Sequence, residues 1–92
     1  MTDPPPLAEG VARVHEHLRA TEELPMETAA THRIAEAQAV VADLDDADLP
    51  AERVRERLAH VRDLLAGVDG TGHPEGDERV AAAESLVAAL LE

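Results

Sequence analysis

Hydrophobic residues recur along the chain at steps of three and four, the spacing that places side chains on one face of an α-helix. Segments with this pattern predict four helices, near residues 5–22, 26–44, 50–66 and 74–92. The first segment shows the pattern most simply, in Leu7, Val11, Val14 and Leu18. No segment alternates apolar and polar residues as a half-buried strand does. The pattern therefore predicts an all-α protein.

Residues typical of helix ends stand at the predicted boundaries. Thr2 or Asp3 is placed to cap the first helix, ahead of prolines suited to a first turn. The segments ELPME (23–27) and DLPAE (48–52) share the order acid, Leu, Pro, apolar, Glu, which predicts two helix starts with the leucine packing back against the helix. This repetition fits either a duplicated two-helix unit or the same helix-start chemistry arising twice.

Short connections between successive helices make neighbours antiparallel, so residues 1–92 are expected to form one domain, an up-and-down antiparallel bundle of four helices. A bundle of this size buries only about 60% of its chain surface, and dimerisation would complete such a core. Val40, Leu64 and Leu86 lie about 80–100° from the centre of their apolar stripes on a helical wheel. They either widen the buried stripes or form a partner interface.

The segment GVDGTGHPEGDERV (67–80) holds four of the five glycines and invites three ligand-binding interpretations. A P-loop fails because His73 and Pro74 stand where Lys and Ser/Thr would reach phosphate and magnesium. A calcium loop fails because Pro74 takes the place of its glycine, and a dinucleotide fingerprint lacks its third glycine. The segment is instead predicted to join two helices, with Gly67 in the left-handed conformation and a new helix starting at Pro74 or Asp77.

Charge dominates the composition: 20 acidic residues stand against 8 basic ones, all arginine, for a net charge of −12. This surface disfavours nucleic acid, whose binding relies on Lys and Arg. No apolar run approaches the roughly 20 residues of a membrane span, and no leader pattern opens the chain. Salt of about 1 M shortens the Debye length to about 3 Å and would relieve the self-repulsion. We therefore expect a cytoplasmic protein suited to high salt.

The side-chain inventory argues against an enzyme or a cofactor site. The chain has no cysteine, aromatic residue or lysine, and only one serine, which removes thiolate nucleophiles and aromatic stacking. A deep pocket with two convergent carboxylates would reopen the enzyme hypothesis. Glu56, His60 and Asp63 follow steps of four and three along one helix face and are weak candidates for a divalent metal, although a solvated helix face explains the same spacing.

The stretches VRDLLAGVDGTGHPEGDERVAAAESL and ATEELPMETAATHRIAEAQAVVADL resemble a group of short acidic proteins of halophilic archaea whose function is unknown. The resemblance implies a cytoplasmic haloarchaeal origin and carries no functional residues with it. We expect a non-enzymatic interaction or structural module that binds itself as a homodimer or binds another protein. The alternative is a metal-binding or small-ligand-binding protein that uses surface histidines and carboxylates.

Overall fold

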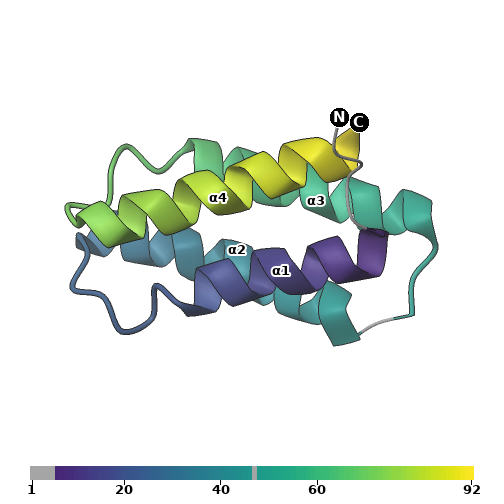
Figure 1. Cartoon of the computed structure of the whole chain (residues 1–92), viewed down its shortest axis with the longest axis horizontal. Helices are drawn as coiled ribbons and strands as arrows, with labels where there is room; N and C mark the ends of the chain where they lie inside the picture. Colours follow the sequence, from purple (N-terminus) through teal and green to yellow (C-terminus); the bar gives the residue numbers. More distant parts are fainter. Residues whose placement is uncertain (1–5, 47) are drawn as a thin grey trace.

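The computed structural model describes residues 6–46 and 48–92. Its helices are α1 (Leu7–Arg19), α2 (Thr28–Asp46), α3 (Ala51–Ala66) and α4 (Pro74–Leu91). α1 packs against α2 and α4, and α3 packs against the same two helices, with consecutive helices antiparallel (Figure 1). This arrangement confirms the predicted all-α bundle, and the described residues include no strand. None of the helices in this part of the chain is both long and apolar enough to cross a membrane.

The helix bounds follow the sequence pattern closely, and the differences have local causes. The first helix ends at Arg19 instead of near residue 22. α2 begins at Thr28, two residues after its predicted start, because the Glu27 N–H donates to the carbonyl of Thr71 in another connection (2.8 Å). The predicted caps Thr2 and Asp3 lie outside the described residues.

The core is built from the apolar stripes of all four helices. Its most enclosed side chains include one from each helix: Leu18, Ile34, Leu58 and Val87. Every buried side chain of the core is aliphatic, so cohesion comes from apolar burial and close packing without aromatic contacts. α1 and α4 approach closely at Gly10, where an added Cβ would collide with the Leu90 side chain.

The end of the bundle that holds residues 20–27 and 67–73 is tied together by hydrogen bonds, and we name it the closed end. Thr71 is fully buried there, and its backbone N–H and hydroxyl lie 2.8 and 2.9 Å from Asp77 Oδ1. The same hydroxyl accepts a hydrogen bond from the His73 N–H (3.1 Å). Since the Glu27 N–H donates to the Thr71 carbonyl, one residue links both connections.

These hydrogen bonds lower the pKa of Asp77 below its ordinary value of 3.8. The main cause is the Thr71 backbone N–H, followed by the Thr71 hydroxyl, because both donate to the ionised carboxylate. Asp77 also lies in the first turn of α4, where the positive end of the helix dipole favours an acid. The start of α4 at Pro74 is one of the two positions predicted from the sequence.

The prediction for Gly67 was wrong. Gly67 keeps a right-handed backbone (φ −79°, ψ −5°), and the positive φ angles of this connection belong to Gly70 (85°) and Gly72 (77°). The reversal of the chain therefore comes after the helix end, in the turn itself. Gly67 meets a different need, because an added Cβ would lie 2.6 Å from the Arg33 guanidinium.

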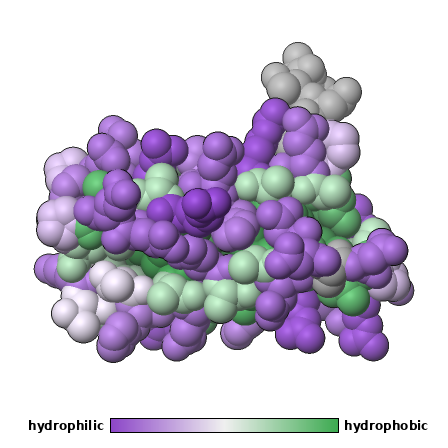
Figure 2. Space-filling model, turned by 90° about the horizontal axis from the view of Figure 1, so that it is seen from below, coloured by the Kyte–Doolittle hydropathy of each residue, from purple (hydrophilic) through white to green (hydrophobic). Residues whose placement is uncertain are grey.

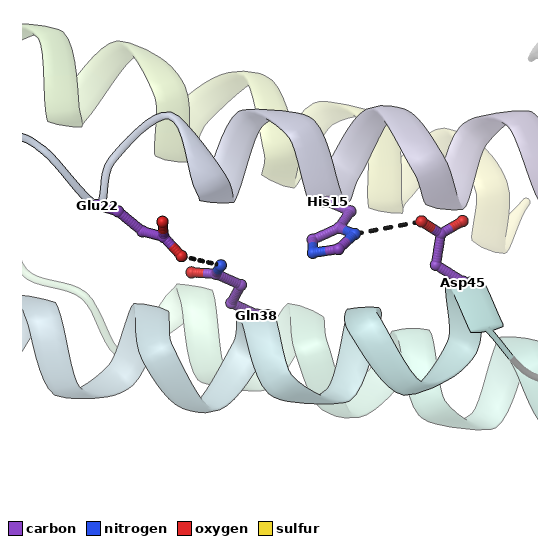
Figure 3. A network of polar contacts seen from close by, with 4 residues as sticks. All are labelled: His15, Glu22, Gln38 and Asp45. Atoms are coloured by element: carbon purple, nitrogen blue, oxygen red, sulfur yellow. Dashed lines mark hydrogen bonds and ion pairs between the residues drawn. The ribbon is translucent and has the colours of Figure 1, made fainter.

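Polar side chains fix the register between α1 and its neighbours. On the α1–α2 edge, His15 Nδ1 lies 3.2 Å from Asp45 Oδ2, and the Gln38 amide donates to Glu22 (Figure 3). His15 and Glu22 are seven residues apart, and so are Gln38 and Asp45. The two contacts therefore lie on the same side of this edge. On the α1–α4 edge, the Arg79 guanidinium donates to His17 Nδ1 (3.2 Å).

Candidate functional site

The three residues predicted for a partner interface have different environments. Leu64 is 8% exposed and belongs to the hydrophobic core of the single chain, where it widens the buried stripe of α3. Val40 and Leu86 are half-buried and pack against that core. Leu64 therefore widens the buried stripe, which was one of the two alternatives. Of the three residues, Val40 and Leu86 keep partly exposed surface.

Val40 and Leu86 lie on opposite edges of the bundle. Val40 lines a surface hollow with Arg57, which places it on the α2–α3 edge. Leu86 follows Arg79 by seven residues and so has nearly the same angular position on α4. Because Arg79 reaches His17 of α1, this side of α4 faces α1. The two residues do not form one continuous face with each other.

The candidate metal residues Glu56, His60 and Asp63 are exposed along α3. Glu56 lies 3.7 Å from the Arg53 guanidinium, an exposed ion pair within the helix. In residues 6–46 and 48–92, no three His, Cys, Asp or Glu side chains come together in a group able to hold a metal ion. Glu56, His60 and Asp63 therefore do not form such a group in the described part of the chain.

A hollow of about 260 Å³ lies at the other end of the bundle, beside the start of α1, the end of α2 and the start of α3. We name this end, which also holds residues 48–50, the open end. The apolar lining of the hollow includes Leu7, Val11, Leu44, Leu49 and Val54. Leu49 is 41% exposed and is the one large hydrophobic residue of the described chain that counts as exposed. Val11, Leu44 and Val54 are buried and Leu7 is half-buried, so Leu49 is the exposed large apolar side chain of this lining.

A second, shallower hollow of about 120 Å³ adjoins the first on the α2–α3 edge. Leu44 and Leu49 line both hollows, and Val40 extends the apolar lining along α2. Figure 2 shows a mostly hydrophilic surface on which hydrophobic groups emerge along the length of the bundle, including its right-hand end, the end of the α2–α3 connection. The predicted residue Val40 is therefore part of a larger apolar strip that the sequence pattern did not identify.

Acidic residues surround this strip near the C-terminal end of α2, where the helix dipole disfavours negative charge. Asp45 and Asp48 line the larger hollow, Asp43 lines the smaller one, and Asp46 is the last residue of α2. The last turn of α2 carries no basic residue, although the negative end of a helix dipole favours cations by about 0.3–1 kcal/mol each. Of these acids, Asp45 is near a basic partner, His15. The negative charge at this end of α2 therefore lowers the stability of the helix.

Leu49 shows why sequence reasoning missed this site. The DLPAE segment was interpreted as a helix start whose leucine packs back on the helix, and α3 does begin at Ala51. Leu49 and Val54, the two positions that such a staple joins, line the same hollow, yet Leu49 remains 41% exposed. The signal that could have identified the site is the run DLDDADL (43–49), which places leucines among aspartates at a helix end.

No curated protein and no solved structure matches the chain. Residues 10–92 match the family model of a domain of unknown function, DUF8152. The match includes α2, α3 and α4 in full and most of α1. Because it covers most of the sequence, the chain belongs to the DUF8152 family.

Proposed function

We propose that the chain is a non-enzymatic protein–protein interaction module whose binding surface is the open end. The observation that carries the proposal is the apolar hollow lined by Leu7, Leu44 and Leu49, with Leu49 exposed to solvent. Apolar side chains gathered around a concave surface are typical of sites that anchor a partner side chain. The partner is another protein or a second copy of this chain.

The size of the hollow favours a side chain over a small molecule as its occupant. Pockets for small molecules mostly measure about 300–1,000 Å³ and enclose most of the ligand. The larger hollow, at about 260 Å³, is below that range and is open to solvent. It suits a single bulky apolar side chain presented by a protein surface. This observation favours a protein partner over the alternative of a small-ligand-binding role.

We also propose that the protein acts in the cytoplasm of a salt-accumulating, haloarchaeal cell. The support is the net charge of −12 in 92 residues together with the absence of lysine. A charge of this density opposes a compact fold in dilute buffer, and about 1 M salt shortens its range to about 3 Å. Apolar contacts persist under those conditions, which suits an interface anchored by leucines.

Cross-linking from a single thiol tests the proposed surface. Because the sequence has no cysteine, Leu49→Cys carries one thiol to which a photoreactive cross-linker can be attached. Leu24→Cys is the matched control, since Leu24 lines a smaller hollow at the closed end. Both labelled chains are added to extract of the native cells at about 1 M salt, a concentration that screens the surface charge.

The proposal predicts a cross-linked product of defined mass from position 49 and none from position 24. A product of twice the chain mass identifies a second copy as the partner, and any other mass identifies another protein. Equal products from both positions, or none from position 49, would contradict the assignment of the open end as the binding surface.

A further inference from the structure

The open end offers two kinds of recognition at once. Leu44 and Leu49 line both hollows and give an apolar strip. Asp43, Asp45 and Asp48 also line these hollows and are exposed. Among the described residues that line either hollow, Arg57 alone is basic. A partner that covers this end must therefore combine an apolar side chain with positive charge.

Resting on the interaction role proposed above, we infer that the occupant is a cationic amphipathic helix of another protein. A bulky apolar side chain of that helix enters the larger hollow beside Leu49. Arginines or lysines on the flanks of its apolar stripe pair with Asp43 and Asp48, which line the smaller and the larger hollow. The negative end of the α2 dipole adds to the attraction for these cations.

Charge complementarity favours another protein over a second copy. In a two-fold symmetric dimer the same surface meets itself, so the aspartates of one open end would approach those of the other. Each chain has a net charge of −12, and among the described residues that line the hollows Arg57 alone could compensate the aspartates of a second copy. A cationic partner instead removes the charge repulsion that the aspartates at the end of α2 create.

A helix fits this end better than an extended segment does. The described residues contain no strand whose edge could accept the backbone of an extended peptide. An amphipathic helix satisfies its own backbone hydrogen bonds and buries only the apolar stripe in a groove between helices. The apolar strip formed by Val40, Leu44 and Leu49 follows the α2–α3 edge, along which such a helix can lie.

Two peptides of about 20 residues, long enough to form isolated helices, provide the test. They share one leucine stripe, and one carries lysine and arginine on the flanks where the other carries glutamate. Binding to the full chain is measured by fluorescence anisotropy and mapped by backbone-amide NMR shifts. At about 0.15 M salt, where the Debye length is about 8 Å, circular dichroism first verifies that the chain keeps its helices, and the cationic peptide should then bind at least about tenfold more tightly. The difference should shrink at about 1 M salt.

Matched variants locate the contacts. Leu49→Ser should weaken the cationic peptide about tenfold or more, whereas Leu24→Ser at the closed end should leave its affinity unchanged. The double variant Asp43→Asn with Asp48→Asn should weaken it several-fold at about 0.15 M salt. Asp63→Asn with Asp69→Asn changes the net charge by the same amount away from the open end and should have a smaller effect. NMR shifts should concentrate at the ends of α2 and α3 that meet at the open end.

Several results would overturn the inference. Equal affinities for the two peptides, or equal effects of the two double variants, would show that charge at the open end does not select the partner. Binding of neither peptide, a cross-linked dimer through position 49, or binding only after deletion of residues 1–5 would each assign the hollow to a different occupant or to none. The cross-linking experiment still decides independently whether the open end binds any protein.

Discussion

The two ends of the bundle differ in the side chains that they bury and expose. At the closed end, Thr71 is fully buried and its polar groups have partners in Asp77, His73 and Glu27. At the open end, Leu49 is 41% exposed and lies beside a hollow of about 260 Å³. Hydrogen-bonded buried groups such as those of Thr71 rigidify a structure, although His73 Nδ1 is buried at the same end without a hydrogen-bond partner. Exposed apolar groups, in contrast, lower their free energy by binding. We infer that the closed end maintains the fold and that the open end meets a partner.

Removing the Thr71 hydroxyl should cause the largest loss of stability among the changes considered for the two ends. Thr71→Val keeps the volume but leaves Asp77 and the His73 N–H each without one partner. We expect a loss of about 2 kcal/mol in the free energy of unfolding, measured by denaturant titration. Thr31→Val is the control, because the exposed Thr31 hydroxyl donates only to the Glu27 carbonyl. Equal effects of the two variants would contradict the special role of the buried Thr71 hydroxyl in the closed end.

Two helical glycines provide a comparison of packing at the two ends. In Gly76→Ala the new Cβ would meet Thr71 Oγ1 at 2.7 Å, and hydrogen bonds hold that oxygen in place. In Gly10→Ala it would meet Leu90, a flexible side chain next to the end of α4. Gly76→Ala should lose about 1 kcal/mol of stability or more through overpacking. A gain of about 1 kcal/mol in helix propensity applies to both positions, so the order depends on which neighbour can move; Gly10→Ala should lose less because Leu90 lies near the end of α4, whereas hydrogen bonds hold Thr71. Thermal unfolding of both variants tests this order.

The closed end should also respond to acid, although less strongly, since Asp77 is exposed. Its pKa is lower in the folded chain than the ordinary value of 3.8. The stabilisation by its carboxylate is therefore complete above that value and disappears as the pH falls through the folded pKa. The wild-type chain should be more stable than Asp77→Asn near pH 6 (about two units above the ordinary value), and this difference should shrink on acidification below 3.8. A difference that is constant with pH would contradict the ionic contribution.

The smallest effect expected is a gain of stability at the open end. Asp46 is the last residue of α2 and stands at the negative end of the helix dipole. Asp46→Asn should stabilise the chain by about 0.3–1 kcal/mol in dilute buffer, and the gain should fall at about 1 M salt. Asp77 stands near the positive end of α4, so neutralising it should have the opposite sign. If both changes destabilise the fold, the electrostatic contrast between the ends is wrong.

The sequence predicted the helices well because the apolar spacing alone determines which residues form them. The stripe of Leu7, Val11, Val14 and Leu18 requires no knowledge of the other helices. The late start of α2 was not predictable in this way, because it depends on a hydrogen bond from Glu27 to Thr71, far away in the sequence. The close approach of Gly67 to Arg33 likewise involves another helix and was not predictable from the segment around Gly67.

The candidate site was only partly predictable for the same reason. Val40 was singled out from its angle on a helical wheel, and it does line the apolar strip. The strip itself requires α2, residues 48–50 and α3 to meet, which no single-helix pattern reveals. Leu64 has a similar wheel angle yet lies in the core, because its angle alone does not say whether a neighbouring helix covers it.

The central claim is that the open end binds a protein and the closed end does not. Extending the single-cysteine cross-linking to two positions at each end tests it most directly, with Leu49 and Ala51 at the open end and Leu24 and Asp69 at the closed end. In native extract at about 1 M salt, we predict one product of the same mass from positions 49 and 51 and none from 24 and 69. Products from the closed-end positions alone, or in equal yield from all four, would contradict the account.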